Sequence, residues 1–226
     1  MITKPIIFST PMIQAILNGR KTQTRRVLKP QPHKYLPEGK YRYDGLQEFI
    51  PAIELLDANG EPTEKYFSCG KPRYQPNDLL WVREVWRYCE DANGYCYKAS
   101  QPYEADNCRK FASVCAHSPK WRSPIHMPKE AARIWLRVTG VKVERLNDIS
   151  NDDAKAEGIP EGSNSTHFNL DGSIKEHIDY TDYIEEYREL WDKIHKNDGY
   201  HCWNLNPWVF VYEFERIEEP EGWLSA

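Results

Sequence analysis

The sequence predicts an α+β fold built around a small mixed β-barrel, in one large domain or two small ones. The 226-residue chain has 40% hydrophobic and 28% charged residues, which is the composition of a globular protein long enough to bury a core. Segments with strand character outnumber helical ones. Loops and single helices separate these strands, which favours a mixed barrel over a doubly wound sheet with regular crossovers.

The N-terminal region predicts a short strand followed by a well-delimited helix. Residues 6–8 are an apolar run of strand type. Thr10 can cap the next helix, Pro11 suits its first turn, and Gly19 suits its left-handed end. The basic stretch 20–26 is therefore expected to leave the helix in a tight turn and to continue as extended chain.

The middle of the chain is less regular. Seven prolines lie within residues 30–77, which predicts a long loop or inserted region. Residues 79–86 form a strand candidate, and residues 95–99 are expected to pair with it across a turn at 91–94. Residues 101–128 favour no single class of secondary structure.

The second half predicts two further strands and two helices. Residues 134–144 alternate as a half-buried strand or as a hairpin around Gly140, and residues 208–215 form a closing strand. Ser150 and Asp153 resemble a capping box that opens a short helix. Residues 180–194 have the spacing of an amphipathic helix, whose aromatic stripe we assign to the core and not to a stacking platform.

Charge is unevenly distributed along the chain. Residues 1–34 carry seven Lys and Arg and no Asp or Glu, whereas residues 144–226 carry twenty acidic against seven basic residues. This pattern favours a local anion site over a wholly cationic nucleic-acid coat, with ordinary solvated faces as the alternative. No apolar run approaches the roughly 18 residues of a spanning helix. Pro5 and Pro11 interrupt any signal-peptide stretch, so we expect a cytoplasmic protein with no membrane partner.

The cysteines and the common motifs indicate no cofactor. None of the six cysteines forms a Cys-x-x-Cys pair. A zinc site from two cysteine pairs and a histidine (Cys89 with Cys96, Cys108 with Cys115, and His117) is the alternative, but their spacing is longer than structural zinc ligands usually show. Phosphate-loop, dinucleotide-turn, zinc-helix and nucleophile-elbow motifs do not occur, so we expect neither a metal nor a cofactor.

Residues 19–26, Gly-Arg-Lys-Thr-Gln-Thr-Arg-Arg, resemble the Gly-x-Lys-x-x-(Glu/Thr)-x-Arg signature of the ASCH domain family. Blocks at 76–86, 121–128 and 206–209 are similar to those of the longer ASCH proteins of bacteriophages and prophages. The resemblance implies a PUA-like β-barrel with flanking helices, formed as one domain over residues 1–226 with insertions at about 34–75 and 88–120. It also implies a phage or prophage protein in the cytoplasm of a bacterial host.

A small bacterial member of this family is an amidohydrolase that removes the acetyl group from N(4)-acetylcytidine. The resemblance places its proposed catalytic Lys, Thr and Glu on Lys21, Thr24 and Glu157. Glu157 would lie in the last turn of a short helix, where the helix dipole disfavours an acid, so a non-structural role is worth considering. Six further residues are candidates for substrate binding: Arg20, Arg25, Arg26, Arg83, Glu84 and Trp86.

Amide hydrolysis needs a nucleophile, a group that takes its proton, and positive charge near the developing oxyanion. Lys21, with its pKa lowered by burial and cationic neighbours, could act as the base for the Thr24 hydroxyl. Alternatively, Glu157 could hold Lys21 charged as an oxyanion stabiliser and itself activate Thr24 or a water molecule. The residues favour neither assignment.

The basic residues have binding and structural alternatives. Arg20, Arg25 and Arg26 could contact phosphate or cover a helix end. Arg83 and Glu84 could recognise a base edge or pair with each other. Two functions follow: a metal-independent amidohydrolase for an acylated pyrimidine nucleoside, such as N(4)-acetylcytidine, or an RNA- or DNA-binding module without catalysis.

Overall fold

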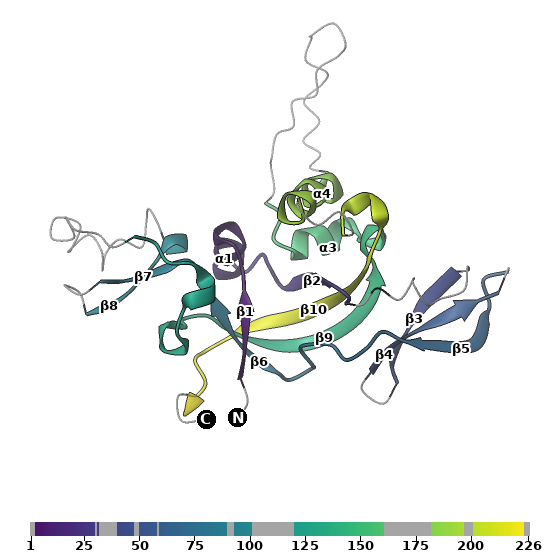
Figure 1. Ribbon diagram of the computed structural model, residues 1–226, viewed down its shortest axis with the longest axis horizontal. Coiled ribbons are helices and arrows are strands. Elements are labelled where there is room, and N and C mark those ends of the chain that lie inside the picture. The colour runs from purple at the N-terminus through teal and green to yellow at the C-terminus, as the bar shows by residue number, and fades with distance from the viewer. Residues whose placement is uncertain are drawn as a thin grey trace, which may run out of the picture. The chain divides into compact units, whose positions relative to one another are not determined.

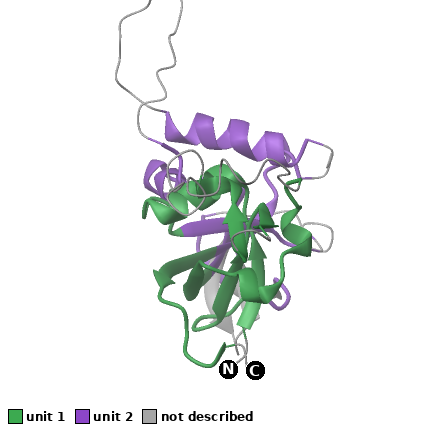
Figure 2. Ribbon diagram, turned by 90° about the vertical axis from the view of Figure 1, so that its left-hand side faces the viewer, with its two compact units in different colours: residues 1–22, 73–141, 212–226 green, residues 23–72, 142–211 purple. Residues whose placement is uncertain are grey.

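The computed structural model describes residues 3–29, 31, 40–47, 50–57, 59–89, 93–100, 120–160, 182–196 and 201–223. The chain forms two compact units, coloured separately in Figure 2. Unit 1 comprises residues 1–22, 73–141 and 212–226, and unit 2 comprises residues 23–72 and 142–211. Within the described residues, no helix is long and apolar enough to cross a membrane.

The main sheet has five strands in the order β1-β6-β9-β10-β2 (Figure 1). These strands are β1 (Thr3–Ile7), β2 (Gln23–Val27), β6 (Leu79–Arg83), β9 (Trp135–Arg145) and β10 (Trp208–Ile217). β1 pairs with β6 in parallel and β6 pairs with β9 antiparallel, so the sheet is mixed. The α+β class is confirmed. The predicted closed barrel is not seen among the described strands, because β1 and β2 form the two edges of an open order.

In unit 1, helix α1 (Thr10–Leu17) follows β1, as the sequence predicts. Ser9 occupies the N-cap position in place of Thr10, and Pro11 lies in the first turn. Gly19 has φ +73° and ends the helix in the left-handed conformation that glycine adopts without strain. The helix buries Ile13 and Ile16 within this unit.

The strand predicted over residues 79–86 divides into β6 and β7 (Trp86–Cys89). The hairpin partner β8 (Gly94–Tyr97) pairs with β7, so the expected hairpin exists but uses β7 and not the whole predicted segment. Asn93 takes a positive φ of 45° in the turn. Three short 3-10 turns complete this part of unit 1: η2 (Lys98–Ser100), η3 (Pro124–His126) and η4 (Lys129–Ala131).

Of the two interpretations of residues 30–77, the long loop is wrong, whereas the inserted region stays a prediction. Residues Lys40–Gln47, Ile50–Leu56 and Pro62–Ser68 form strands β3, β4 and β5 of a separate antiparallel sheet in unit 2. Pro62 is the first residue of β5 and Pro51 the second of β4, positions near strand starts where proline removes little from a ladder. Proline count therefore overstated the irregularity of this region.

β9 is one continuous strand and not a hairpin at Gly140. Its buried positions change phase there, from Leu136 and Val138 to Val141 and Val143. A Cβ at Gly140 would lie 2.7 Å from Glu213 Oε2, so a side chain at this position would require the end of the Glu213 side chain to shift.

The core of unit 2 lies between the sheet and two helices, α3 (Asn151–Ala156) and α4 (Tyr183–Ile194). Tyr187 and Trp191 of α4 pack in this core with Val209 and Val211 of β10. Figure 1 shows α3 and α4 on the same side of strands β2 and β10. The aromatic stripe is therefore core, as predicted, although Tyr180 lies outside the described residues. Two 3-10 turns, η5 (Leu146–Asp148) and η6 (Trp203–Leu205), lie at the ends of β9 and β10.

Candidate active site

Lys21 lies in the turn that leaves α1. The backbone N–H groups of Arg20 and Lys21 both donate to the carbonyl oxygen of Ala15, at 2.9 and 3.1 Å. Only 2% of Lys21 is exposed, and its Nζ lies 5.6 Å from the centroid of the Phe8 ring. Lysine side chains are seldom buried to this extent, so this position is unusual for its residue type.

Thr24 is the second residue of β2 and is also buried. Side chains alternate along a strand, so Thr24 and Arg26 point to one face of β2 and Gln23 and Arg25 to the other. Arg26 is exposed, as is Arg20 at the end of the preceding helix. Of the three arginines in this basic stretch, only Arg25 is buried.

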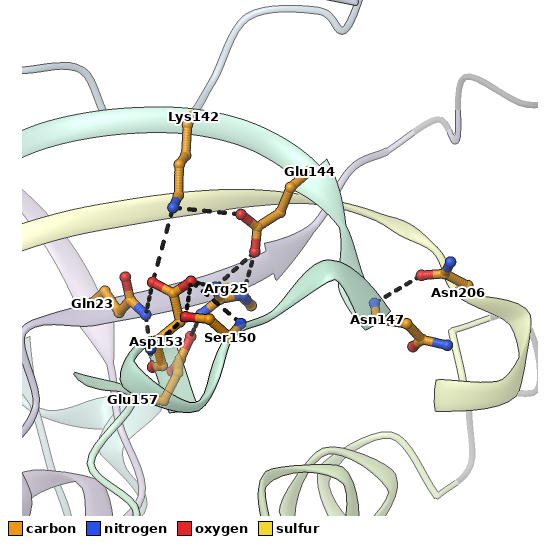
Figure 3. A network of polar contacts seen from close by, with 9 residues as sticks. All are labelled: Gln23, Arg25, Lys142, Glu144, Asn147, Ser150, Asp153, Glu157 and Asn206. Carbon is orange, nitrogen blue, oxygen red and sulfur yellow. Dashed lines mark hydrogen bonds and ion pairs between the residues drawn. The ribbon is translucent and has the colours of Figure 1, made fainter. Parts of the chain in front are cut away.

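Arg25 forms the centre of a polar network in unit 2 (Figure 3). Its Nε donates to Glu144 Oε1 at 2.8 Å, and its Nη1 donates to Glu157 Oε1 at 3.1 Å. Nη2 lies 2.7 Å from Glu144 Oε1 and 3.5 Å from Asp153 Oδ2. Burial alone would lower the pKa of Arg25, but the charges of Glu157 and Glu144 outweigh it and raise that pKa above its usual value.

Helix α3 supplies two of these acids. Ser150 Oγ accepts from the backbone N–H of Asp153 at 3.1 Å and Asp153 Oδ2 accepts from that of Ser150 at 3.5 Å, which confirms the predicted capping box. Glu157 is the C-cap residue and is 3% exposed. An acid here faces the negative end of the helix dipole, and the ion pair with Arg25 provides the structural compensation that the sequence did not reveal.

Two further side chains complete the network. Gln23 Nε2 donates to the carbonyl oxygen of Asp153 at 2.7 Å and to its Oδ1 at 3.0 Å. Lys142 Nζ lies 3.5 Å from Glu144 Oε2 and 3.9 Å from Asp153 Oδ1 (Figure 3). Burial opposes ionisation of Asp153, but hydrogen bonds from Gln23 and Ser150 and the nearby cations lower its pKa below the usual value.

The other predicted binding residues lie in unit 1. Glu84 is 1% exposed and pairs with Arg133, whose Nε and Nη2 donate to its two carboxylate oxygens at 2.9 and 3.0 Å. The sequence had offered Arg83 as its partner. Instead, Arg83 lies 4.5 Å from the Trp81 ring centroid and donates to the carbonyl oxygen of Ile125. Trp86 is buried, with the guanidinium of Arg122 5.2 Å from its ring centroid.

The structure thus brings Arg25 and Glu157 together and places Thr24 on the same strand as Arg25. Sequence reasoning missed Gln23, Lys142 and Glu144 as members of the network. Lys142 and Glu144 are two positions apart in β9 and therefore lie on the same face of the strand. No local sequence pattern predicts that this face contacts Arg25, which is 119 positions from Glu144.

Within the described residues, no group of three or more His, Cys, Asp or Glu side chains could hold a metal ion. In the same part of the chain, Cys69, Cys89, Cys96 and Cys202 are not in disulfide bonds. Cys108, Cys115 and His117, named above as alternative zinc ligands, lie outside the described residues.

Comparison with known proteins assigns no family. No protein-family model matches the chain, and no curated protein matches it. Among solved structures, the chain resembles protein EF3133 from Enterococcus faecalis V583, described as family-model DUF984, with 10% sequence identity and a TM-score of 0.41. The match covers 96% of this chain and 78% of the other. At such low similarity, function has to be argued from the residues of this chain.

Proposed function

We propose that this protein is a metal-independent amidohydrolase that removes the acyl group from an acylated pyrimidine nucleoside such as N(4)-acetylcytidine. In this proposal, the open sheet belongs to a PUA-like ASCH fold, and Lys21, Thr24 and Glu157 are the residues on which the reaction depends. The family signature at residues 19–26 suggests the reaction class.

The observation that carries the proposal is the burial of these three polar side chains. Among the described residues, six polar or charged side chains are buried: Lys21, Gln23, Thr24, Arg25, Glu84 and Glu157. Four of them lie within five consecutive residues, and Glu157 is bound by one of those four. Burying charge and hydrogen-bonding groups costs free energy, and such costs are concentrated where chemistry needs groups removed from water.

The Arg25–Glu157 bond supports one of the two chemical assignments. Glu157 is engaged by Arg25, whose side chain points to the face of β2 opposite that of Thr24. We therefore assign Lys21 as the acceptor of the Thr24 proton, and Glu157 as a positioning residue that acts through Arg25 and strand β2.

The proposed reaction has two steps. Thr24 Oγ1 attacks the acyl carbon as its proton passes to Lys21 Nζ, and collapse of the tetrahedral intermediate breaks the C–N bond, with Lys21 returning the proton to the leaving amine. Water then attacks the threonyl ester, and one of its protons passes through Lys21 to the Thr24 oxygen as the ester bond breaks. The carboxylic acid that leaves loses its remaining proton to solvent. Atoms and charge balance without any metal or redox partner.

The test is to incubate the purified protein with N(4)-acetylcytidine and to quantify cytidine and acetate by chromatography. Equimolar products are expected, and Lys21→Ala or Thr24→Ala should lower kcat by roughly 100-fold or more, as for loss of a general base or nucleophile. Thr22→Ala and Lys29→Ala change exposed residues of the same types and serve as matched controls. No turnover by the wild-type protein, or full activity in both Lys21→Ala and Thr24→Ala, would contradict the proposal.

A further inference from the structure

The separate sheet of unit 2, β3-β4-β5, has an apolar face. Paired residues of antiparallel strands share a face of the sheet, and so do residues two apart in one strand. Tyr43 pairs with Ile53 and Ile53 pairs with Phe67, so these three residues form one row across the sheet. Tyr41 pairs with Leu55, which places both residues on the same face, next to that row. None of the five carries a charge, and we call the face that they form the Tyr43 face.

The charged residues of the paired positions lie on the opposite face. Arg42 pairs with Glu54 and Glu54 pairs with Tyr66, and this second row alternates with the first along each strand. Lys40 lies two positions from Arg42 and shares its face. Lys65 falls in the irregular part of the β4–β5 ladder, where the register shifts. The sheet is therefore amphipathic: its charged face suits water, and its Tyr43 face has to be covered.

The two described helices of unit 2 bury their apolar residues elsewhere. Tyr187 and Trp191 of α4 pack with Val211 of β10, and Ala154 of α3 belongs to the same cluster. Figure 1 shows β3, β4 and β5 side by side, with neither α3 nor α4 lying over them. A sheet with one apolar face needs a second layer, because a single layer would leave that face in water. These helices therefore do not supply the second layer.

A second copy of the same sheet meets this requirement. A face without charge needs an uncharged, apolar partner, and two sheets that pack face to face lie about 10 Å apart with interdigitated side chains. Tyrosine and phenylalanine, which make up three of the five residues of the Tyr43 face, are also enriched in protein interfaces. In a two-fold dimer each copy uses the same surface, so the Tyr43 face would meet its own pattern.

The area of the face is sufficient for a dimer. Aromatic side chains bury roughly 150–250 Å² each, so the three aromatic and two aliphatic residues from each of two copies would bury on the order of 1,200 Å² in total. Specific interfaces bury about 1,200–2,000 Å². The Tyr43 face alone therefore reaches the lower end of this range.

We propose that the protein forms a two-fold dimer in which the Tyr43 faces of two copies pack against each other. The interface is closed, because each copy contributes its whole Tyr43 face and keeps no further copy of it to extend the assembly. The dimer uses the three strands that replace the predicted loop, and none of its residues belongs to the proposed reaction. This inference therefore does not depend on the amidohydrolase activity.

The test is sedimentation velocity on the full chain at protein concentrations up to about 100 μM, where a dimer of micromolar affinity is well populated. The wild type should sediment as a dimer that dissociates on dilution. Tyr43→Lys should raise the dissociation constant at least about 100-fold, because the dimer would bury a lysine ammonium without a partner. Tyr66→Lys makes the same change on the opposite face of the sheet and is the matched control, for which an unchanged dissociation constant is expected.

Photo-cross-linking provides a measurement that does not depend on a charged variant remaining folded. p-Benzoylphenylalanine in place of Tyr43 keeps the face aromatic and should cross-link two chains on irradiation, whereas the same residue in place of Tyr66 should not. The proposal is overturned if the wild type is monomeric at about 100 μM. It is also overturned if Tyr43→Lys and Tyr66→Lys weaken the dimer equally, or if positions 43 and 66 cross-link equally well. Each outcome is obtained without substrate, so it is distinct from the result of the amidohydrolase assay.

Discussion

Arg25 Nη1 donates a hydrogen bond to Glu157 Oε1 at 3.1 Å, and neither side chain is more than 2% exposed. The pair joins strand β2 to the C-terminal end of helix α3, across 132 positions of the chain. Because Glu144 and Asp153 also contact Arg25, one guanidinium balances three carboxylates with the help of Lys142. This arrangement makes Arg25 the residue on which the stability of the network depends.

Removing Arg25 should therefore destabilise the protein strongly. Arg25→Leu leaves the buried Glu157 carboxylate without its cation, and we expect a loss of about 3–5 kcal/mol in the free energy of unfolding. Arg26→Leu, at the next and exposed position, should change it by less than about 0.5 kcal/mol. Urea unfolding followed by circular dichroism measures both. Equal effects of the two variants would show that Arg25 is not the centre of the network.

Substitutions of Arg25 and Glu157 should have coupled effects on the free energy of unfolding. A double-mutant cycle with Arg25→Met and Glu157→Met should give a double variant less destabilised than the sum of the single variants, by about 0.5–3 kcal/mol. The physical reason is that losing both charges leaves no uncompensated ion between these two positions. Additive effects would indicate that the two side chains do not interact in solution.

Acid should weaken the network through Asp153. The folded-state pKa of Asp153 is lowered, so its contribution to stability is present above the unfolded pKa of about 3.9 and is lost as the pH falls through the folded value. We expect Asp153→Asn to flatten the decline of the thermal midpoint at acidic pH, below about 4. The side chain of Asp152 is 95% exposed, so Asp152→Asn is the control and should leave the decline of the thermal midpoint at acidic pH unchanged.

The capping box predicts a smaller and local effect. Ser150→Ala removes the acceptor for the Asp153 backbone N–H and should cost about 1 kcal/mol. Ser150→Asn should restore most of that loss, because asparagine is an equally good N-cap residue and adds no charge beside Asp153, whose Oδ2 lies 2.9 Å from Ser150 Oγ. Thermal denaturation of the two variants beside the wild type distinguishes loss of the cap from a general effect of substitution at this position, which would leave Ser150→Asn as unstable as Ser150→Ala.

The sequence by itself determined the elements whose signals are local. Pro11 and Gly19 delimit α1, Ser150 and Asp153 open α3, and the alternation over residues 208–215 gives β10, because each signal depends on contacts within a few residues. The burial of Tyr187 and Trp191 also follows from spacing along one helix.

The tertiary structure decided which distant segments meet. It paired Glu84 with Arg133 in place of Arg83, joined Arg25 to Glu144 and Glu157, and formed β3 to β5 where prolines suggested a loop. Partner choice between charged side chains depends on which strands become neighbours, and an isolated ion pair has too little free energy to specify that choice. Burial of the sheet faces and helices sets the strand order, and the polar network forms on the scaffold that results.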